Sequence, residues 1–124
     1  MKVLLSIKPK YAFKIFDGSK KYEFRKNIFR RKDINKIVVY ASSPVQRIIG
    51  EFEIADILHE ETELLWQMTQ HYSGITKDFY DQYFENRKHA FAIQVGKVKK
   101  YSQPKLLSDL DIDFAPQSFA YLGA

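Results

Sequence analysis

The sequence contains no cysteine, which excludes a disulfide scaffold, a thiol nucleophile, a thiolate zinc site and an iron–sulfur cluster. It has only five glycines and no glycine-rich phosphate loop, so the standard nucleotide-binding motifs are missing. No apolar run approaches the roughly 18 residues of a membrane-spanning helix, and no signal-peptide core follows Met1. We therefore expect a soluble, cytoplasmic protein that uses no cofactor and no membrane.

Common catalytic motifs are missing as well. The three histidines, His59, His71 and His89, lack the HxxxH and HExxH spacings that bring two imidazoles onto one helix face, so we expect no metal site. No serine stands in a G-x-S-x-G elbow, the motif that exposes a hydrolase nucleophile. The sequence gives no support for a standard hydrolase.

Length and composition indicate one folded domain spanning residues 1–124, with 45% hydrophobic and 28% charged residues. The net charge of +5 is unevenly spread. Residues 1–50 carry thirteen basic and three acidic side chains, whereas residues 51–90 carry three basic and nine acidic ones. A basic segment of this kind is typical of a surface that binds a polyanion, although a solvated basic face would show the same pattern.

Hydrophobic patterning predicts strands and helices in an irregular order. Short strands are expected at 3–7, 21–25, 37–40, 47–54 and 90–95, with a last one within 114–122 after a break at Pro104. A short helix should begin near Pro9 and end at Gly18, and two more should lie between about 60 and 86, the second capped by Thr76. Residues 27–34 are too charged for a core and are expected to form a basic loop.

The strands are mostly joined closely, with helices inserted among them, and they do not alternate with helices as in a doubly wound sheet. This order favours an α+β fold, either a small, mainly antiparallel sheet or a small mixed or antiparallel β-barrel, with helices packed around it.

One cluster of charged residues stands out between Gly18 and Arg25. Gly18 allows a sharp turn from helix to strand, Lys20 lies at the strand entry, and Glu23 and Arg25 project from one strand face. The carboxylate can hold its basic neighbours in place by charge-assisted hydrogen bonds. Spacing alone leaves two interpretations open, a structural ion pair or a functional site.

The pattern G-x-K-x-x-E-x-R, formed by Gly18, Lys20, Glu23 and Arg25, resembles the signature of the ASCH domain, a family of the PUA-like superfamily. Four segments in order resemble short stand-alone ASCH proteins described as predicted transcriptional regulators: LLSIKPKYAFKIFDGSKKYEFRK, VVYASSPVQRIIGEFEI, AFAIQV and APQSFAYL. The resemblance implies a PUA-like barrel with a basic cleft that recognises RNA or a nucleotide, with a regulatory role in transcription, translation or RNA metabolism.

Carried over by position, the resemblance places Lys20, Glu23 and Arg25 in the cleft. Residues that flank the matching segments are weaker candidates: Lys8, Ser42, Ser43, Gln117 and Ser118. Tyr40 is either a platform on which a base stacks or a core aromatic. Five basic residues of the charged segment are expected to follow the phosphates of the nucleic acid: Lys21, Lys26, Arg30, Arg31 and Lys32.

Two other classes of function remain open. Some ASCH proteins resemble enzymes, either amidohydrolases of acetylated cytidine nucleosides or single-strand ribonucleases, and Lys20 and Glu23 would then be the catalytic pair. The amidohydrolase branch has a threonine where this sequence has Glu23, which weakens that interpretation. The other class is a protein-interaction domain that uses the acidic segment 51–90.

Overall fold

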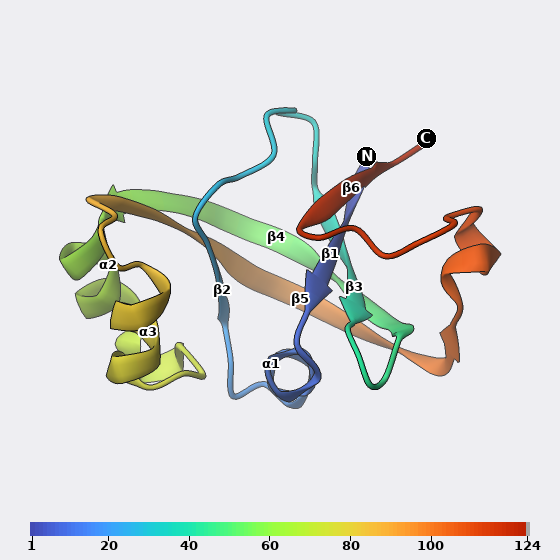
Figure 1. Cartoon of the computed structure of the whole chain (residues 1–124), viewed down its shortest axis with the longest axis horizontal. Coiled ribbons are helices and arrows are strands. Elements are labelled where there is room, and N and C mark those ends of the chain that lie inside the picture. The colour runs from blue at the N-terminus through green and yellow to red at the C-terminus, as the bar shows by residue number, and fades with distance from the viewer. Residues whose placement is uncertain (124) are drawn as a thin grey trace.

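The computed structural model describes residues 1–123. Within that range, Figure 1 shows a strongly bent sheet with helices at one end and along one edge. The strands are β1 (Lys2–Ile7), β2 (Tyr22–Arg25), β3 (Lys36–Ala41), β4 (Arg47–Glu61), β5 (His89–Lys105) and β6 (Phe119–Leu122). The helices are α1 (Pro9–Asp17), α2 (Thr62–Thr69) and α3 (Lys77–Tyr83), with 3-10 turns at η1 (Gln70–Tyr72) and η2 (Leu107–Leu110).

The six strands form one sheet in the order β2-β5-β4-β3-β1-β6. The β1–β3 pair is parallel and the other pairs are antiparallel. The α+β class is confirmed, but the sheet is not closed into the barrel that the resemblance implies, because β2 and β6 remain its two edges. The free edge of β1 is covered by the short strand β6 along residues 2–5, so no backbone ladder joins β1 to β2.

Strands β4 and β5 are much longer than the predicted 47–54 and 90–95. They pair over most of their length as a twisted ribbon with register shifts near Ile48, Phe52 and Ile54. Pro104 lies within β5 and does not break it, because the pairing passes from Gly50–Lys100 directly to Ile48–Lys105. Proline lacks an amide hydrogen, and at this irregularity no ladder bond is lost.

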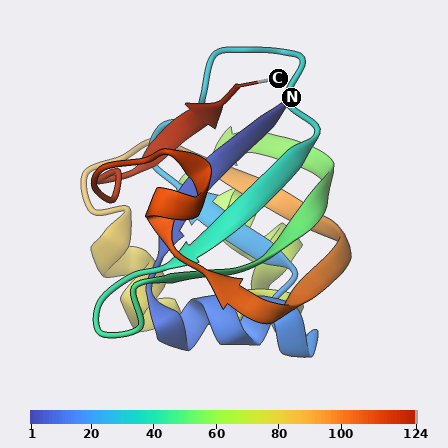
Figure 2. The ribbon, with the colours of Figure 1, turned by 90° about the vertical axis from the view of Figure 1, so that its right-hand side faces the viewer.

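Apolar residues of β1 pack on both faces of the sheet, as expected of a continuous apolar run. Val3, Leu5 and Ile7 belong to a core cluster that also contains Ala12 and Ile15 of α1. Leu4 faces the opposite side, in a cluster with Val38, Tyr40 and Ile48. The chain between β5 and β6 covers that second face, as Figure 2 shows in orange to red.

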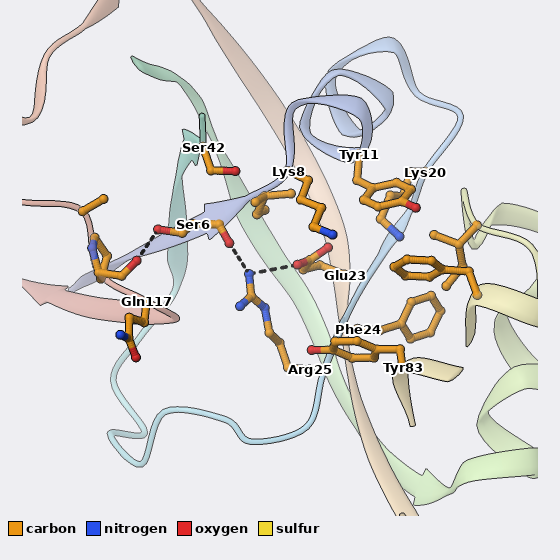
Figure 3. Close-up of a pocket in the computed structure, with 15 residues that line it drawn as sticks. Ser6, Lys8, Tyr11, Lys20, Glu23, Phe24, Arg25, Ser42, Tyr83 and Gln117 are labelled. Carbon is orange, nitrogen blue, oxygen red and sulfur yellow. Dashed lines mark hydrogen bonds and ion pairs between the residues drawn. The ribbon is translucent and has the colours of Figure 1, made fainter. Parts of the chain in front are cut away.

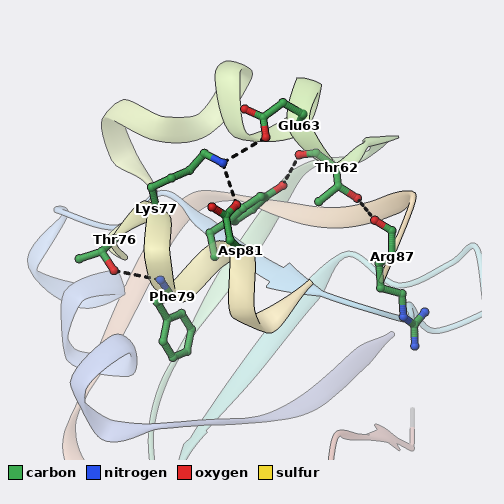
Figure 4. Close-up of polar contacts among 8 residues, drawn as sticks. Thr62, Glu63, Thr76, Lys77, Phe79, Asp81 and Arg87 are labelled. Carbon is green, nitrogen blue, oxygen red and sulfur yellow. Dashed lines mark hydrogen bonds and ion pairs between the residues drawn. The ribbon is translucent and has the colours of Figure 1, made fainter. Parts of the chain in front are cut away.

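Helices α2 and α3 enclose the third core cluster and are tied to each other by polar contacts (Figure 4). The Lys77 ammonium lies 3.1 Å from a Glu63 carboxylate oxygen and 2.7 Å from one of Asp81. The Tyr80 hydroxyl donates a hydrogen bond of 2.7 Å to the carbonyl of Thr62. Thr76 caps α3 as predicted, because its hydroxyl accepts from the Phe79 amide at 3.1 Å.

No helix in the described part of the chain has the length and apolar character needed to cross a membrane.

Candidate functional site

The turn between α1 and β2 directs Lys20 into the protein. Helix α1 begins with Pro9 and ends at Gly18, which adopts a left-handed conformation with φ of 89°, as the sequence predicts. The Ser19 amide donates to an Asp17 carboxylate oxygen at 2.8 Å, and the Lys20 amide donates to the carbonyl of Lys14 at 3.1 Å. These bonds fix the chain reversal, so the Lys20 side chain, two residues before β2, points into the protein.

Lys20 is a buried lysine, with only 2% of its surface exposed. Its ammonium donates a hydrogen bond of 2.6 Å to the carbonyl of Ser73 and lies 4.9 Å from the centre of the Phe24 ring. Burial lowers the pKa of Lys20 from 10.5 to about 8, and the nearby carboxylate of Glu23 only partly opposes this effect.

The segment that follows η1 closes over Lys20. Gly74 has a φ of 71°, and a Cβ atom at this position would lie 2.6 Å from the Cβ of Lys20. The Lys14 ammonium donates to the carbonyl of Gly74 at 3.1 Å and holds the segment against α1. Only glycine fits here, because the backbone itself packs on the lysine stem.

Glu23 and Arg25 form a mostly buried ion pair that also bridges two strands. The Arg25 Nη2 atom lies 3.0 Å from a Glu23 carboxylate oxygen and donates to the carbonyl of Ser6 in β1 at 2.9 Å (Figure 3). Its Nη1 atom lies 3.5 Å from the Ser118 hydroxyl. Arg25 therefore connects β2 to β1 by a side chain, where a closed barrel would use backbone hydrogen bonds.

A cavity of about 440 Å³ lies beside this ion pair. That volume falls in the range of small-molecule sites. One wall carries polar and charged groups, and the other carries aromatic rings from α1, β2 and α3, as Figure 3 shows. The polar wall includes Ser6, Lys8, Glu23, Arg25, Ser42 and Gln117, and the aromatic wall includes Tyr11, Phe24, Phe79 and Tyr83.

Six of the residues proposed from the sequence line this cavity: Lys8, Lys20, Glu23, Arg25, Ser42 and Gln117. Ser118 lies next to it through its contact with Arg25, whereas Ser43 is exposed in the turn after β3 and does not line the cavity. Tyr40 is 4% exposed, on the sheet face covered by the chain after β5. Its ring belongs to the core, and no face of it is open for a base to stack on.

The five residues expected to follow phosphates do not form one uniform row. Lys26 lies 4.9 Å from the ring centre of Tyr83, at the side of the cavity, and Lys21 lies 4.5 Å from that of Tyr72. Arg31 is held by Asp33 through two hydrogen bonds of 3.0 and 2.7 Å, so part of its charge is balanced within the loop. The remaining two, Arg30 and Lys32, are exposed in the same loop.

Sequence reasoning missed the aromatic wall. Phe79 and Tyr83 are spaced four residues apart, which on a short helix is the usual pattern of core residues. In the structure their rings are parallel, with centres 6.3 Å apart, and both side chains stay half-buried at the cavity. Tyr11 contacts Phe79 at 5.4 Å between ring centres and extends the wall onto α1.

Comparison with protein families matches residues 5–99 to the ASCH domain. The match covers well over half of the chain and includes the whole segment from Gly18 to Arg25. The chain therefore belongs to the ASCH domain family, as the G-x-K-x-x-E-x-R pattern predicts.

Solved structures from Zymomonas mobilis share the fold over nearly the whole chain. The ASCH protein of that organism superposes with a TM-score of 0.90 at 26% identity, covering 98% of this chain and 87% of that one. A curated ASCH domain-containing ribonuclease from Zymomonas mobilis is 29% identical over 122 residues, which is 96% of this chain and 82% of that protein.

Two curated relatives from Ureaplasma parvum are longer proteins. The chain is 32% identical over 121 residues to a protein named ATP synthase subunit alpha, and 31% identical over 125 residues to one named large ribosomal subunit protein uL22. It covers 97% of its own length in both matches but spans only 15% and 39% of these two relatives. The similarity is thus confined to a part of each.

Proposed function

We propose that this ASCH domain binds single-stranded RNA or a nucleotide in the cavity between β2, β1 and α3. One observation carries the proposal: an aromatic wall faces a wall of cationic and hydrogen-bonding side chains across about 440 Å³. RNA-binding proteins commonly stack unpaired bases on aromatic rings while basic side chains contact the phosphates. The cavity offers both kinds of surface at nucleotide scale.

Phe79 and Tyr83 are the proposed stacking surface for the base. Both are half-buried, so each ring keeps an exposed part for a ligand. On the opposite wall, the exposed Lys8 and the amide of Gln117 are available to phosphate and base edges. The Arg25 guanidinium already contacts Glu23 and the carbonyl of Ser6, so we assign it a role in shaping the cavity wall more than in direct ligand binding.

The similarity to the Zymomonas mobilis proteins supports an RNA-related function, since one of them is named a ribonuclease and matches almost the entire chain. A regulatory role in transcription, translation or RNA metabolism is the form this function takes if the domain binds RNA without cleaving it. The alternative of a protein-interaction domain would instead leave the cavity without an affinity for nucleotides.

Binding is tested with fluorescently labelled single-stranded RNA and with the four ribonucleoside 5′-monophosphates. Replacement of Tyr83 by leucine removes one stacking ring and should weaken binding about tenfold, since base–aromatic stacking contributes about 1–3 kcal/mol. Lys97→Ala is the control, because Lys97 is exposed and does not line this cavity. Failure of every probe to bind at low salt, or equal loss in both variants, would refute the proposal.

A second candidate, RNA hydrolysis, is favoured by the position of Lys20 in the lining of the cavity and by the burial that lowers its pKa. With a pKa of about 8, part of the Lys20 population is a neutral amine near physiological pH, which a general base requires. Incubation with labelled single-stranded RNA, followed by product analysis, separates cleavage from binding. Cleavage that Lys20→Met abolishes in a folded protein would assign catalysis, whereas intact RNA after tight binding would assign a binding module.

The amidohydrolase alternative has less support in the geometry. The Glu23 carboxylate is held in an ion pair with Arg25 at 3.0 Å, so it would have to break this contact to activate a water molecule. N4-acetylcytidine belongs in the same incubation, with release of cytidine as the readout.

A further inference from the structure

A second cavity of about 450 Å³ lies between α1 and the segment that connects η1 to α3. Its lining is richer in polar groups than the first cavity and includes Lys10, Lys14, Ser19, Gln70, His71 and Thr76.

The charge of this second cavity suits an anion. Lys10 and Lys14 are cations, and among its lining residues, as far as the structure describes the chain, none is acidic. The Lys14 ammonium donates one hydrogen to the carbonyl of Gly74 at 3.1 Å and has two more to donate. Lys10 and His71 are exposed, so both can reach a ligand without rearrangement of the core.

The two cavities lie side by side and share one wall. Tyr11, Ile75 and Phe79 line both of them, and all three side chains are half-buried. Tyr11 and Phe79 contact each other, with ring centres 5.4 Å apart, and together they form an aromatic ridge between the cavities. A ligand strand that leaves the first cavity across this ridge enters the polar, cationic second cavity.

We propose that the second cavity binds the adjacent nucleotide of a single RNA strand, with its phosphate held by Lys10, Lys14 and His71. The inference rests on the proposed function of the first cavity and deepens it. The ligand is then an oligonucleotide that spans the ridge, and a mononucleotide fills only half of the surface. Tyr11 and Phe79 at the ridge can stack on bases where the RNA strand passes from one cavity to the other, because stacking tolerates any base.

The experiment compares the dissociation constants of ribonucleoside 5′-monophosphates with those of the matching 5′-phosphorylated dinucleotides, using the full chain and checking the samples for cleavage. The dinucleotides should bind about tenfold more tightly, the effect of one further charge-assisted contact. A dinucleotide can place either of its two nucleotides in the first cavity, and this statistical effect by itself would tighten binding only about twofold.

Two exposed positions allow a variant that should keep the fold. Lys10→Ala combined with His71→Ala should weaken dinucleotide binding at least about fivefold and leave mononucleotide binding unchanged, because neither residue lines the first cavity. Lys97→Ala, which removes an exposed cation from a third cavity that shares no lining residue with these two, should change neither.

Mononucleotide binding without a gain for dinucleotides would overturn the inference and leave the proposed function standing. An equal loss for both ligands in the Lys10 and His71 variant would also overturn it, since the second cavity would then not be a separate subsite. If neither ligand binds, the proposed function fails, and the inference that rests on it fails as well.

Discussion

At the scale of single residues, Lys20 carries a charge in a place that disfavours it. Its pKa of about 8 in the folded protein lies below the 10.5 of an exposed lysine, so between these pH values the unfolded state binds more protons. Burying the ammonium therefore costs stability below about pH 8, and the cost is relieved as the pH rises toward 10.5.

Lys20→Met, which keeps an unbranched side chain and removes the titration, should reveal this effect. The free energy of unfolding of the native protein, relative to the variant, should rise by about 2 kcal/mol between pH 8 and pH 10. Urea denaturation at both pH values measures it. Loss of the hydrogen bond to Ser73 changes the free energy of unfolding of the variant by a similar amount at both pH values. A difference between the native protein and the variant that stays the same at both pH values would contradict the lowered pKa.

The contribution of Arg25 to the free energy of unfolding also depends on burial. Arg25→Gln leaves the Glu23 carboxylate mostly buried without its counter-charge and should lower the free energy of unfolding by about 3 kcal/mol. Urea denaturation of Arg25→Gln and of the double variant with Glu23→Gln gives the coupling, and the double variant should be more stable than Arg25→Gln alone.

The pair Arg31–Asp33 provides a matched comparison. It is shorter, at 2.7 Å, but its side chains are 46% and 54% exposed. Arg31→Gln should therefore cost less than about 1 kcal/mol, because water screens exposed ion pairs. Equal losses for Arg25→Gln and Arg31→Gln would show that the bridge between β2 and β1 contributes no more than a surface contact.

At the scale of structural elements, the segment between η1 and α3 holds Lys20 in place. Gly74→Ala should displace this segment, because the added Cβ would lie 2.6 Å from the Cβ of Lys20 and φ is 71°. Gly18→Ala is the matched control, with a φ of 89° but no atom within 4 Å of the added Cβ.

Thermal unfolding of the two glycine variants separates the strain from the clash. Gly18→Ala should cost about 1 kcal/mol from the left-handed backbone alone, and Gly74→Ala should cost clearly more. RNA binding should weaken only in Gly74→Ala. If both variants lose the same stability and both keep binding, the segment does not position Lys20.

At the scale of the whole molecule, positive charge is concentrated in the N-terminal 50 residues and negative charge in residues 51–90. If about four cations contact the phosphates of a single strand, the logarithm of the RNA association constant should fall with the logarithm of salt concentration with a slope near −3. Titrations at several salt concentrations give the slope. Arg30→Ala should make it shallower by about 0.7 for all sequences, while an RNA affinity that barely changes with salt would contradict a phosphate-binding surface.

Much of the local structure of this protein could be predicted from its sequence. Pro9 and Gly18 mark the two ends of α1, Thr76 caps α3, and the apolar runs of β1 and β3 lie in the sheet. Each of these features depends on neighbours within a few residues, such as a missing amide hydrogen, a left-handed turn or a side chain that caps the next turn. The spacing of Lys20, Glu23 and Arg25 likewise depends only on the turn and on strand geometry.

Other features depend on residues far apart in the chain, and only the tertiary structure decided them. Lys20 is buried because residues 73 and 74 fold over it, some 53 positions later. The aromatic wall exists because α3 leaves Phe79 and Tyr83 half-buried beside β2, which helical spacing cannot distinguish from a core. The sheet stays open because β6 returns to cover β1, and Arg25 bridges the remaining gap. Local patterns set what each segment can form, whereas burial and pairing across the chain set which side chains meet.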